Sequence, residues 1–235
     1  MRKGILYIVA TPIGNYEDIT LRALKILRNV DFVICEEFKE ARRLFSAIEV
    51  NPKELFSLNE HNETENAPEY ISRILKGERA ALISDGGTPL FSDPGKYLLN
   101  LAIENNINIV PVPGANSVIT ALSVSGIDLN SFYFAGWLPQ KKEQRRKRLN
   151  ELRKINEPII LMETPYRLVK LVSECTSIFG QKRNAVLSYN LTLPDEKIIR
   201  GNLGQLKKLV TAEKLKGEFV LIIDKKNEVQ NRNKY

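Results

Sequence analysis

The amino-acid sequence predicts an α/β fold built as two α/β domains, and three observations support this prediction. Short apolar runs rich in β-branched residues alternate with segments whose apolar residues recur at helical spacing. Several of these runs end in loops that contain Gly and Pro. Charge is uneven: residues 1–130 carry 13 basic and 17 acidic side chains, whereas residues 131–235 carry 22 and 11. The net charge of +7 therefore originates in the second half, which favours two unlike domains over one uniform body.

The strands expected in the first half are continuous apolar runs, a pattern typical of strands buried on both faces. Segments with helical spacing follow most of them; Thr20 precedes the first such segment and Pro94 opens a later one. Because strands alternate with helices, we expect right-handed crossovers and a mostly parallel sheet. Strands are expected at 5–9, 31–35, 55–58, 80–83 and 107–112, and helices after Thr20 and at 40–48, 66–76, 94–104 and 117–123.

A domain boundary is expected at 126–130, where the sequence has no periodicity. The two domains would then span residues 1–126 and 131–235. The polar tail from Lys225 onward is expected to fray. Strands of the second domain are expected at 132–134, 159–162, 185–189, 197–200 and 219–223, and helices at 143–154, 166–179 and 203–215.

Composition excludes several functional classes. Two lone cysteines, Cys35 and Cys175, exclude a disulfide scaffold and suit a reducing compartment. A single histidine, His61, cannot build a His-rich metal site, and no Gly-x-Ser-x-Gly motif of a hydrolase is present. The longest apolar runs are too short to span a membrane, and the N-terminus leads into the first strand without a secretory signal. We therefore expect a cytoplasmic protein without a metal site or a membrane segment.

Three loops, at 10–15, 84–89 and 111–116, each follow the end of an expected buried strand. In open α/β sheets, ligands bind beyond the carboxyl ends of the strands, where glycine lets a ligand approach the backbone. Each loop alone could be an ordinary turn between a strand and a helix. The sequence has no Gly-x-x-x-x-Gly-Lys loop and no Gly-x-Gly-x-x-Gly fingerprint after a strand, so motifs do not support a nucleoside triphosphate or an NAD-type cofactor. Three such loops at one sheet edge nevertheless favour a ligand site.

The same loops carry a resemblance to a known family. Ala10-Thr11-Pro12-Ile13-Gly14-Asn15 and Ser84-Asp85-Gly86-Gly87-Thr88-Pro89 closely resemble segments of the tetrapyrrole methylase family, in particular its branch of ribose 2′-O-methyltransferases of the small ribosomal subunit. Similar blocks follow in the same order over nearly the whole chain. They lie at 6–15, 17–24, 61–63, 84–90, 92–95, 111–115, 132–139, 163–168 and 217–220.

This resemblance implies two α/β domains that hold S-adenosylmethionine in the cleft between them, and it implies a homodimer. It places cofactor contacts in the three loops and at the end of one strand in the second half. For that last contact, Met162, packing in the core is an alternative, because Met readily fills irregular gaps. The residues implied to bind the cofactor are Ile13, Gly86, Gly87, Leu90, Asn116, Ser117 and Met162.

The sequence does not fix a catalytic base. Orientation alone can remove much of the barrier to methyl transfer, so a dedicated base can be absent. Glu36, after the second strand, is the candidate for accepting a proton from an acceptor hydroxyl, with a solvated strand end as the alternative. His61 is interpreted as a polar substrate contact or a surface residue, and Asp93 as the N-cap of a helix.

The densest positive run is Lys141-Lys142-Glu143-Gln144-Arg145-Arg146-Lys147-Arg148. In a helix this run suits either solvation or contacts with RNA phosphates, which give sequence-independent and salt-sensitive affinity. Selection of a base would need other contacts, to a splayed single-stranded region. The candidates for substrate contact are Arg42, Arg43, Arg145, Arg146 and Arg167.

We predict a methyltransferase that acts on a ribose 2′-hydroxyl of small-subunit rRNA, with rRNA or the small subunit as its partner. The alternatives are a small-molecule acceptor such as a tetrapyrrole, and an RNA-binding member that has lost activity. Two departures from the ribosomal branch keep them open: Glu36-Glu37-Phe38-Lys39 replaces Glu-Asp-Thr-Arg, and Tyr189-Asn190-Leu191-Thr192 replaces Arg-Glu-Leu-Thr. The chain also lacks most of the C-terminal extension of that branch, which indicates a divergent, short member.

Overall fold

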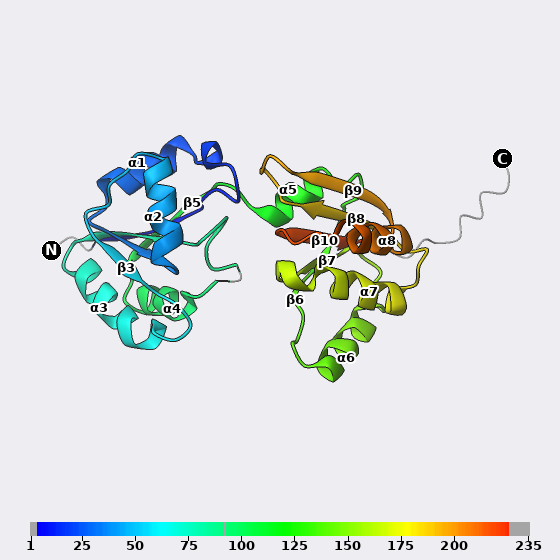
Figure 1. Ribbon diagram of the computed structural model, residues 1–235. Helices are drawn as coiled ribbons and strands as arrows, with labels where there is room; N and C mark the ends of the chain where they lie inside the picture. The colour runs from blue at the N-terminus through cyan, green and yellow to red at the C-terminus, as the bar shows by residue number, and fades with distance from the viewer. Residues whose placement is uncertain (1–3, 92, 226–235) are drawn as a thin grey trace. The chain divides into compact units, whose positions relative to one another are not determined.

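The computed structural model describes residues 4–91 and 93–225, which form two compact units (Figure 1). Each unit contains one five-stranded sheet together with helices, which confirms the predicted α/β class. The division between the units falls after Asn116. Within the described ranges, no helix is both long and apolar enough to span a bilayer.

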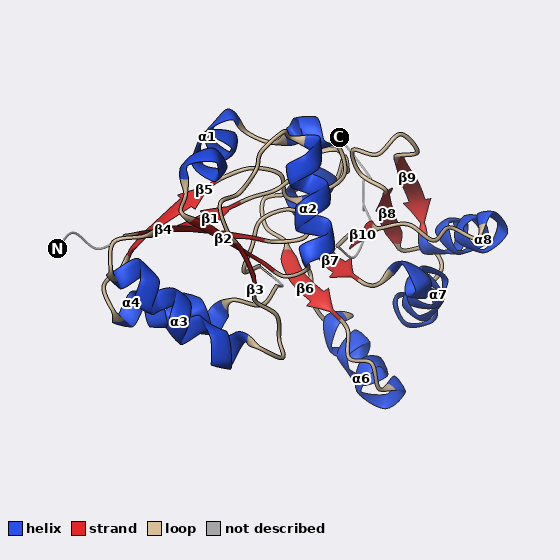
Figure 2. Ribbon diagram, turned by 60° about the vertical axis from the view of Figure 1, so that its left-hand side comes forward, coloured by secondary structure: helices blue, strands red, loops and turns tan. Residues whose placement is uncertain are grey.

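The first unit is built on a parallel sheet. Its strands are β1 (Ile5–Val9), β2 (Phe32–Cys35), β3 (Leu55–Ser57), β4 (Arg79–Ile83) and β5 (Asn108–Val112). Its helices are a 3-10 turn η1 (Tyr16–Asp18), α1 (Leu21–Asn29), α2 (Phe38–Ala47), α3 (Glu63–Leu75) and α4 (Lys96–Glu104). The strand order is β3-β2-β4-β1-β5 and every pair is parallel, as predicted. Helices α1 and α2 cover one face of the sheet, and α3 and α4 cover the other (Figure 2).

Alternate side chains of the first sheet enter two separate cores. Val9 and Val33 pack with residues of α1 and α2, whereas Leu6 and Ile34 pack with residues of α3 and α4. All four residues of β2 are buried, which explains why its sequence lacks the alternation of a half-exposed strand. Because the sheet is packed on both faces, the strand ends from which the three loops emerge are held in defined positions.

The second unit has a mixed sheet. Its elements are α5 (Ser117–Ser123), β6 (Tyr133–Trp137), α6 (Lys142–Leu152), β7 (Ile159–Met162), the 3-10 turn η2 (Pro165–Arg167), α7 (Leu168–Phe179), β8 (Asn184–Tyr189), β9 (Lys197–Asn202), α8 (Leu203–Glu213) and β10 (Phe219–Ile223). The strand order is β6-β7-β10-β8-β9, and among these pairs β6 and β7 alone are parallel. The mostly parallel sheet predicted for the first half does not extend to this unit, because β8 and β9 follow each other without an intervening helix and pair antiparallel.

Helix α5 belongs to the second unit, where it packs against β10. The guanidinium of Arg200 on β9 donates hydrogen bonds to the carbonyl oxygens of Val124 and, at 3.2 Å, Ser125, just beyond the helix. The units therefore divide between Asn116 and Ser117, earlier than the aperiodic segment at 126–130. The boundary lies before α5 because the buried apolar side chains of this helix pack within the second unit.

Helix α4 has Gly95 as its N-cap residue, with a φ of 117°. The carboxylate of Glu63 accepts the backbone N–H groups of Tyr97 at 2.6 Å and Leu98 at 3.3 Å, so a side chain from α3 satisfies the free end of α4. The interpretation of Asp93 as the N-cap is therefore wrong.

Candidate functional site

The three loops that contain Gly and Pro leave the first sheet at one level. Val9, the last residue of β1, lies in register with Ile83 at the end of β4 and with Val112 at the end of β5. These strand ends form part of the carboxyl edge of a parallel sheet, where ligands of such folds bind. The first, second and third loops comprise residues 10–15, 84–89 and 111–116.

Hydrogen bonds join the first loop to the second. The N–H of Thr11 donates to the Gly87 carbonyl at 2.9 Å, and the N–H of Gly87 donates to the Thr11 carbonyl at 3.0 Å. The Thr11 hydroxyl donates to the Ser84 carbonyl at 3.1 Å, and the Ser84 hydroxyl donates to the Gly87 carbonyl at 3.1 Å. Thr11 and Ser84 are both buried, so these bonds are shielded from water and hold the second loop in place.

The third loop is held against the other two. The N–H of Ala10 donates to the Val112 carbonyl at 3.1 Å, and the Thr88 hydroxyl donates to the Ala115 carbonyl at 3.2 Å. A Cβ at Gly114 would lie 3.0 Å from the Ala10 Cβ, closer than side chains normally pack. The three loops therefore form one connected cluster at the sheet edge.

The glycine pair of the second loop gives this cluster room for a ligand. Gly87 has a φ of 91°, a conformation that favours glycine, and a Cβ there would come within 3.2 Å of Ile13 Cγ2. Gly86 is exposed, and a Cβ there would make only an ordinary contact, 3.5 Å from the Pro12 carbonyl oxygen. Packing does not require glycine at position 86, but its bare backbone admits a ligand. The loop cluster thus fits the implied cofactor, S-adenosylmethionine.

The other expected cofactor contacts are divided between the units. Leu90 has a φ of 69°, which is costly for a side chain of this size, and a Cβ on Gly95 would lie only 2.8 Å from its Cδ2. Asn116 ends the third loop in the first unit. Ser117 and Met162 belong to the second unit, at the start of α5 and at the end of β7. The roles of these residues as cofactor contacts stay predictions.

Three carboxyl groups influence one another beside the second loop. Glu36 directly follows β2, and the N–H of the next residue, Glu37, donates to Asp85 Oδ1 at 3.2 Å. Burial, together with the charges of Asp85 and Asp93, raises the pKa of Glu36 to about 7. Burial and Asp85 likewise raise the pKa of Asp93 to about 6. Glu36 can therefore accept a proton near neutral pH, and its electrostatic neighbours Asp85 and Asp93 were missed by sequence reasoning.

His61 lies on the surface of the first unit. Its side chain is 85% exposed, and its Nε2 is 3.5 Å from the carboxylate of Glu60. This exposure is compatible with the interpretation of His61 as a surface residue. Its alternative role as a polar substrate contact stays a prediction.

Arg145 is a structural residue of the second unit. Its side chain is 1% exposed, and its guanidinium donates hydrogen bonds to the carboxylates of Glu163 and Glu174. The prediction that Arg145 contacts RNA phosphates is wrong, because this position of α6 faces the core alongside Leu149 rather than solvent. A run of basic residues in a helix does not reveal which of them points inward.

The other substrate candidates are reachable from solvent. Arg146 is exposed on α6, and Arg42 and Arg43 are exposed on α2. The guanidinium of Arg42 lies 5.6 Å from the centre of the Phe38 ring. Arg167 is partly exposed and lies 3.6 Å from the carboxylate of Glu163, which offsets part of its charge. Contacts of these four side chains with a substrate stay predictions.

The parallel sheet, its level strand ends and the glycine-lined loop cluster define an α/β protein with a candidate small-molecule site at the carboxyl edge of the first sheet. Residues 5–207 match the family model described as Tetrapyrrole (Corrin/Porphyrin) Methylases. The chain belongs to this family, which confirms the resemblance found in its sequence and the predicted class of S-adenosylmethionine-dependent methyltransferase.

Relatives of known name agree on one description. "Ribosomal RNA small subunit methyltransferase I" of Micromonospora olivasterospora is 38% identical over 94% of this chain and 70% of its own length. The proteins of that name from Xylella fastidiosa and Bacillus subtilis are 40% and 37% identical, over 94% and 95% of this chain and 81% and 76% of their own lengths.

Solved structures establish the fold. A cobalt precorrin-4 methyltransferase of cobalamin biosynthesis matches with a TM-score of 0.70 at 20% identity, covering 94% of both chains. Uroporphyrin-III C-methyltransferase from Thermus thermophilus, in complex with S-adenosyl homocysteine, matches with a TM-score of 0.65 at 14% identity, covering 94% of this chain and 97% of its own.

Proposed function

We propose that the chain methylates a ribose 2′-hydroxyl of small-subunit rRNA, with S-adenosylmethionine as the methyl donor. The observation that carries this proposal is the identity of 37% to 40%, over nearly the whole chain, with relatives named ribosomal RNA small subunit methyltransferase I. The basic second half supports a polyanionic acceptor. A tetrapyrrole acceptor is not favoured, because only the general family description and structures of 20% identity or less point to it.

The residues of the chain would act mainly by binding and orientation. When bound, S-adenosylmethionine supplies an electrophilic methyl group on a positively charged sulfur. The linked loops around Thr11, Gly87 and Ala115 would fix the cofactor, and alignment of the reacting groups can remove on the order of 7 kcal/mol of the barrier. Glu36 would receive the proton that the ribose hydroxyl loses, because its pKa of about 7 leaves much of it ionised at neutral pH.

A single assay tests this proposal. The protein is incubated with methyl-labelled S-adenosylmethionine and, in parallel, with small ribosomal subunits, naked rRNA and a tetrapyrrole precursor. We expect label in the subunits or the rRNA, in a nucleotide whose ribose resists alkaline cleavage on its 3′ side. Label in the tetrapyrrole alone would refute an RNA acceptor. Normal cofactor binding without any label would indicate an inactive member of the family.

We also propose that the protein is a cytoplasmic homodimer. Both cysteines are buried and unpaired, which suits a reducing compartment. The homodimer is supported by the family resemblance alone. Sedimentation equilibrium at several concentrations would test it, and a single monomeric species throughout would contradict it.

A further inference from the structure

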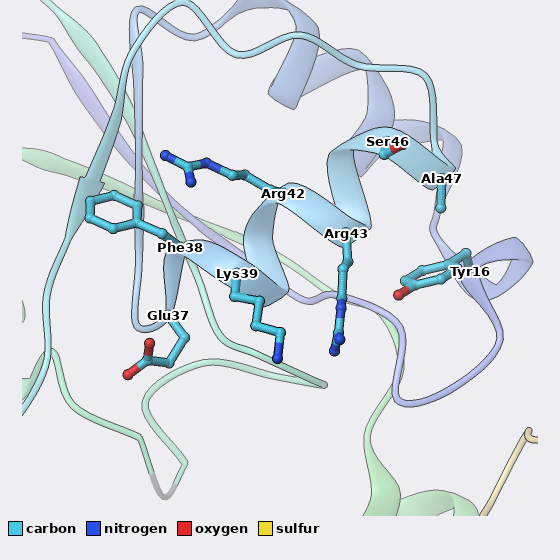
Figure 3. A pocket seen from close by; sticks show the side chains of 8 residues that line it. All are labelled: Tyr16, Glu37, Phe38, Lys39, Arg42, Arg43, Ser46 and Ala47. Atoms are coloured by element: carbon cyan, nitrogen blue, oxygen red, sulfur yellow. The ribbon is translucent and has the colours of Figure 1, made fainter.

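A hollow of about 760 Å³ lies beside α2 in the first unit (Figure 3). Its wall is formed by residues along α2, from Glu37 just before the helix to Ala47 at its end, together with Tyr16 of η1. Two of its residues, Arg42 and Arg43, are candidates for phosphate contact.

The hollow is rich in positive charge on an otherwise acidic half of the chain. Lys39, Arg42 and Arg43 line it, and Figure 3 shows Lys39 and Arg43 extending in the same direction while Arg42 turns away. Lys39 is exposed and makes no ion pair with any residue in 4–91 or 93–225. Arg43 is 55% exposed and lies 2.7 Å from Glu40, which neutralises part of its charge. Two cationic groups side by side suit consecutive phosphates or one phosphate held by both.

Exposed aromatic rings accompany these cations. Tyr16 is 41% exposed and Phe38 is 38% exposed, and both line the hollow. In Figure 3 the Tyr16 side chain extends from η1 toward α2, on the side where Arg43 lies. Aromatic faces next to cations are the combination that binds unpaired bases and their phosphates. A carboxylate, Glu37, also lines the hollow and can accept a hydrogen bond from a ribose hydroxyl or a base amino group.

The hollow adjoins the loops of the candidate cofactor site. Tyr16 directly follows Asn15, the last residue of the first loop. The N–H of Glu37 donates to Asp85 Oδ1 in the second loop at 3.2 Å. The lining of the hollow is therefore joined to the first loop through the chain at Tyr16 and to the second loop through the hydrogen bond of Glu37.

We infer that this hollow binds a nucleotide of single-stranded RNA, with Lys39 and Arg43 at its phosphates and Tyr16 stacked on its base. The inference rests on the proposed function, because it names the site that holds the RNA next to the reacting nucleotide. Single-stranded RNA suits the hollow because only an unpaired base exposes its face to an aromatic ring.

The test measures binding of a fluorescent single-stranded oligouridylate by anisotropy at several salt concentrations. The double variant Lys39→Ala/Arg43→Ala is expected to bind at least about tenfold more weakly, with a salt slope lower by about 1.4 for two lost phosphate contacts. Tyr16→Ala is expected to weaken binding by about tenfold with the salt slope unchanged, and Tyr16→Phe to restore it. The matched control is Lys25→Ala/Arg28→Ala, which removes one Lys and one Arg from the exposed face of α1 in the same unit.

Three binding results would overturn the inference: no binding of oligouridylate by the wild-type chain, equal losses in the α2 and α1 double variants, or an unchanged affinity in Tyr16→Ala. S-adenosylmethionine binding, measured by calorimetry, should be the same in all variants. Methyl transfer to small subunits by the wild-type chain is measured in a separate assay. Transfer to small subunits that survives in Lys39→Ala/Arg43→Ala would refute the hollow as an RNA site but leave the proposed function intact. Loss of oligouridylate binding in that variant, with no transfer by the wild type, would support the hollow as an RNA site but contradict the proposed function.

Discussion

Replacing Arg145 with Met should destabilise the second unit strongly. The guanidinium is 1% exposed and pairs with Glu163, which is itself 2% exposed, so the variant leaves a buried carboxylate with only the partly exposed Arg167, at 3.6 Å, to offset its charge. Removing one partner of a buried ion pair typically costs about 3 to 5 kcal/mol. Urea unfolding followed by circular dichroism would measure this loss.

Arg146→Met is the matched control, because Arg146 is the next residue on α6 and is exposed. It should change the free energy of unfolding by less than about 0.5 kcal/mol. Adding Glu163→Gln to Arg145→Met should recover part of the lost stability by removing a buried charge that has lost its main partner. Equal free energies for Arg145→Met and Arg146→Met would contradict the structural role of Arg145.

Glu36→Gln should alter the pH dependence of stability. The pKa of Glu36 is raised in the folded chain to about 7, so between about pH 4.5 and 7 the folded state binds more protons than the unfolded state. Stability contributed by this group therefore falls as pH rises through that window. The variant should equal the wild type at pH 4 and exceed it by about 1 kcal/mol at pH 8, allowing for the partial exposure of the carboxyl group.

The control for this measurement is Glu69→Gln on α3, a carboxyl group that is exposed. It should leave the difference in unfolding free energy between pH 4 and pH 8 unchanged. If Glu36→Gln shows the same pH dependence as the wild type, Glu36 is not held in a raised-pKa environment and loses its support as a proton acceptor.

At the scale of elements, the second loop is expected to tolerate no side chain at Gly87. Gly87→Leu places a Cβ within 3.2 Å of Ile13 Cγ2 at a φ of 91°, so the bridge to Thr11 must distort. Strain of this kind costs roughly 1 to 2 kcal/mol, and S-adenosylmethionine affinity measured by calorimetry should fall about tenfold or more. Gly180→Leu is the control, because Gly180 has a similar φ of 95° but nothing within 4 Å of its Cβ position. Unchanged affinity in Gly87→Leu would refute the placement of the cofactor.

Most elements could be predicted from the sequence because apolar periodicity is a local property. The strands at Ile159–Met162 and Phe219–Ile223 and the helix at Ser117–Ser123 have the expected bounds. Strand direction was not predictable in the second unit, because the pairing of β10 with β7 and β8 depends on contacts between distant segments. The cap of α4 was missed for the same reason: Glu63 supplies it from another helix.

The candidate site was predictable in outline but not in its electrostatics. Gly and Pro after three strands indicate loops at one sheet edge whatever the tertiary details. The raised pKa of Glu36 depends on Asp85 and Asp93, which are about 50 residues away in the sequence. The hollow beside α2 is lined by both Tyr16 of η1 and Lys39 of α2, a juxtaposition that no local pattern reveals.

At the scale of the whole molecule, charge divides much as the units do. Residues 1–130 have four more acidic than basic side chains, whereas residues 131–235 have eleven more basic than acidic ones. Burial of Arg145 removes one of these cations from the surface, so the count overstates what RNA can reach. Exposed cations remain on both α6 and α8. Comparing variants of the two helices can therefore show whether RNA binds one preferred surface or is attracted by the net charge of the whole unit.

A focused surface on α6 predicts that Arg146→Gln/Lys147→Gln weakens binding of a small-subunit rRNA transcript more than Lys207→Gln/Lys208→Gln on α8 does. All four side chains are exposed, and each double variant removes two positive charges from the second unit. If α6 contacts phosphates, its variant should also lower the salt slope of binding by about 1.4, because each lost single-strand contact lowers the slope by roughly 0.7. Filter binding between low and physiological salt would measure both quantities. Equal losses of RNA affinity in the α6 and α8 variants would mean that the net charge of the unit attracts RNA without a preferred face. An unchanged salt slope in the α6 variant would mean that the α6 cations are solvated and do not contact RNA phosphates.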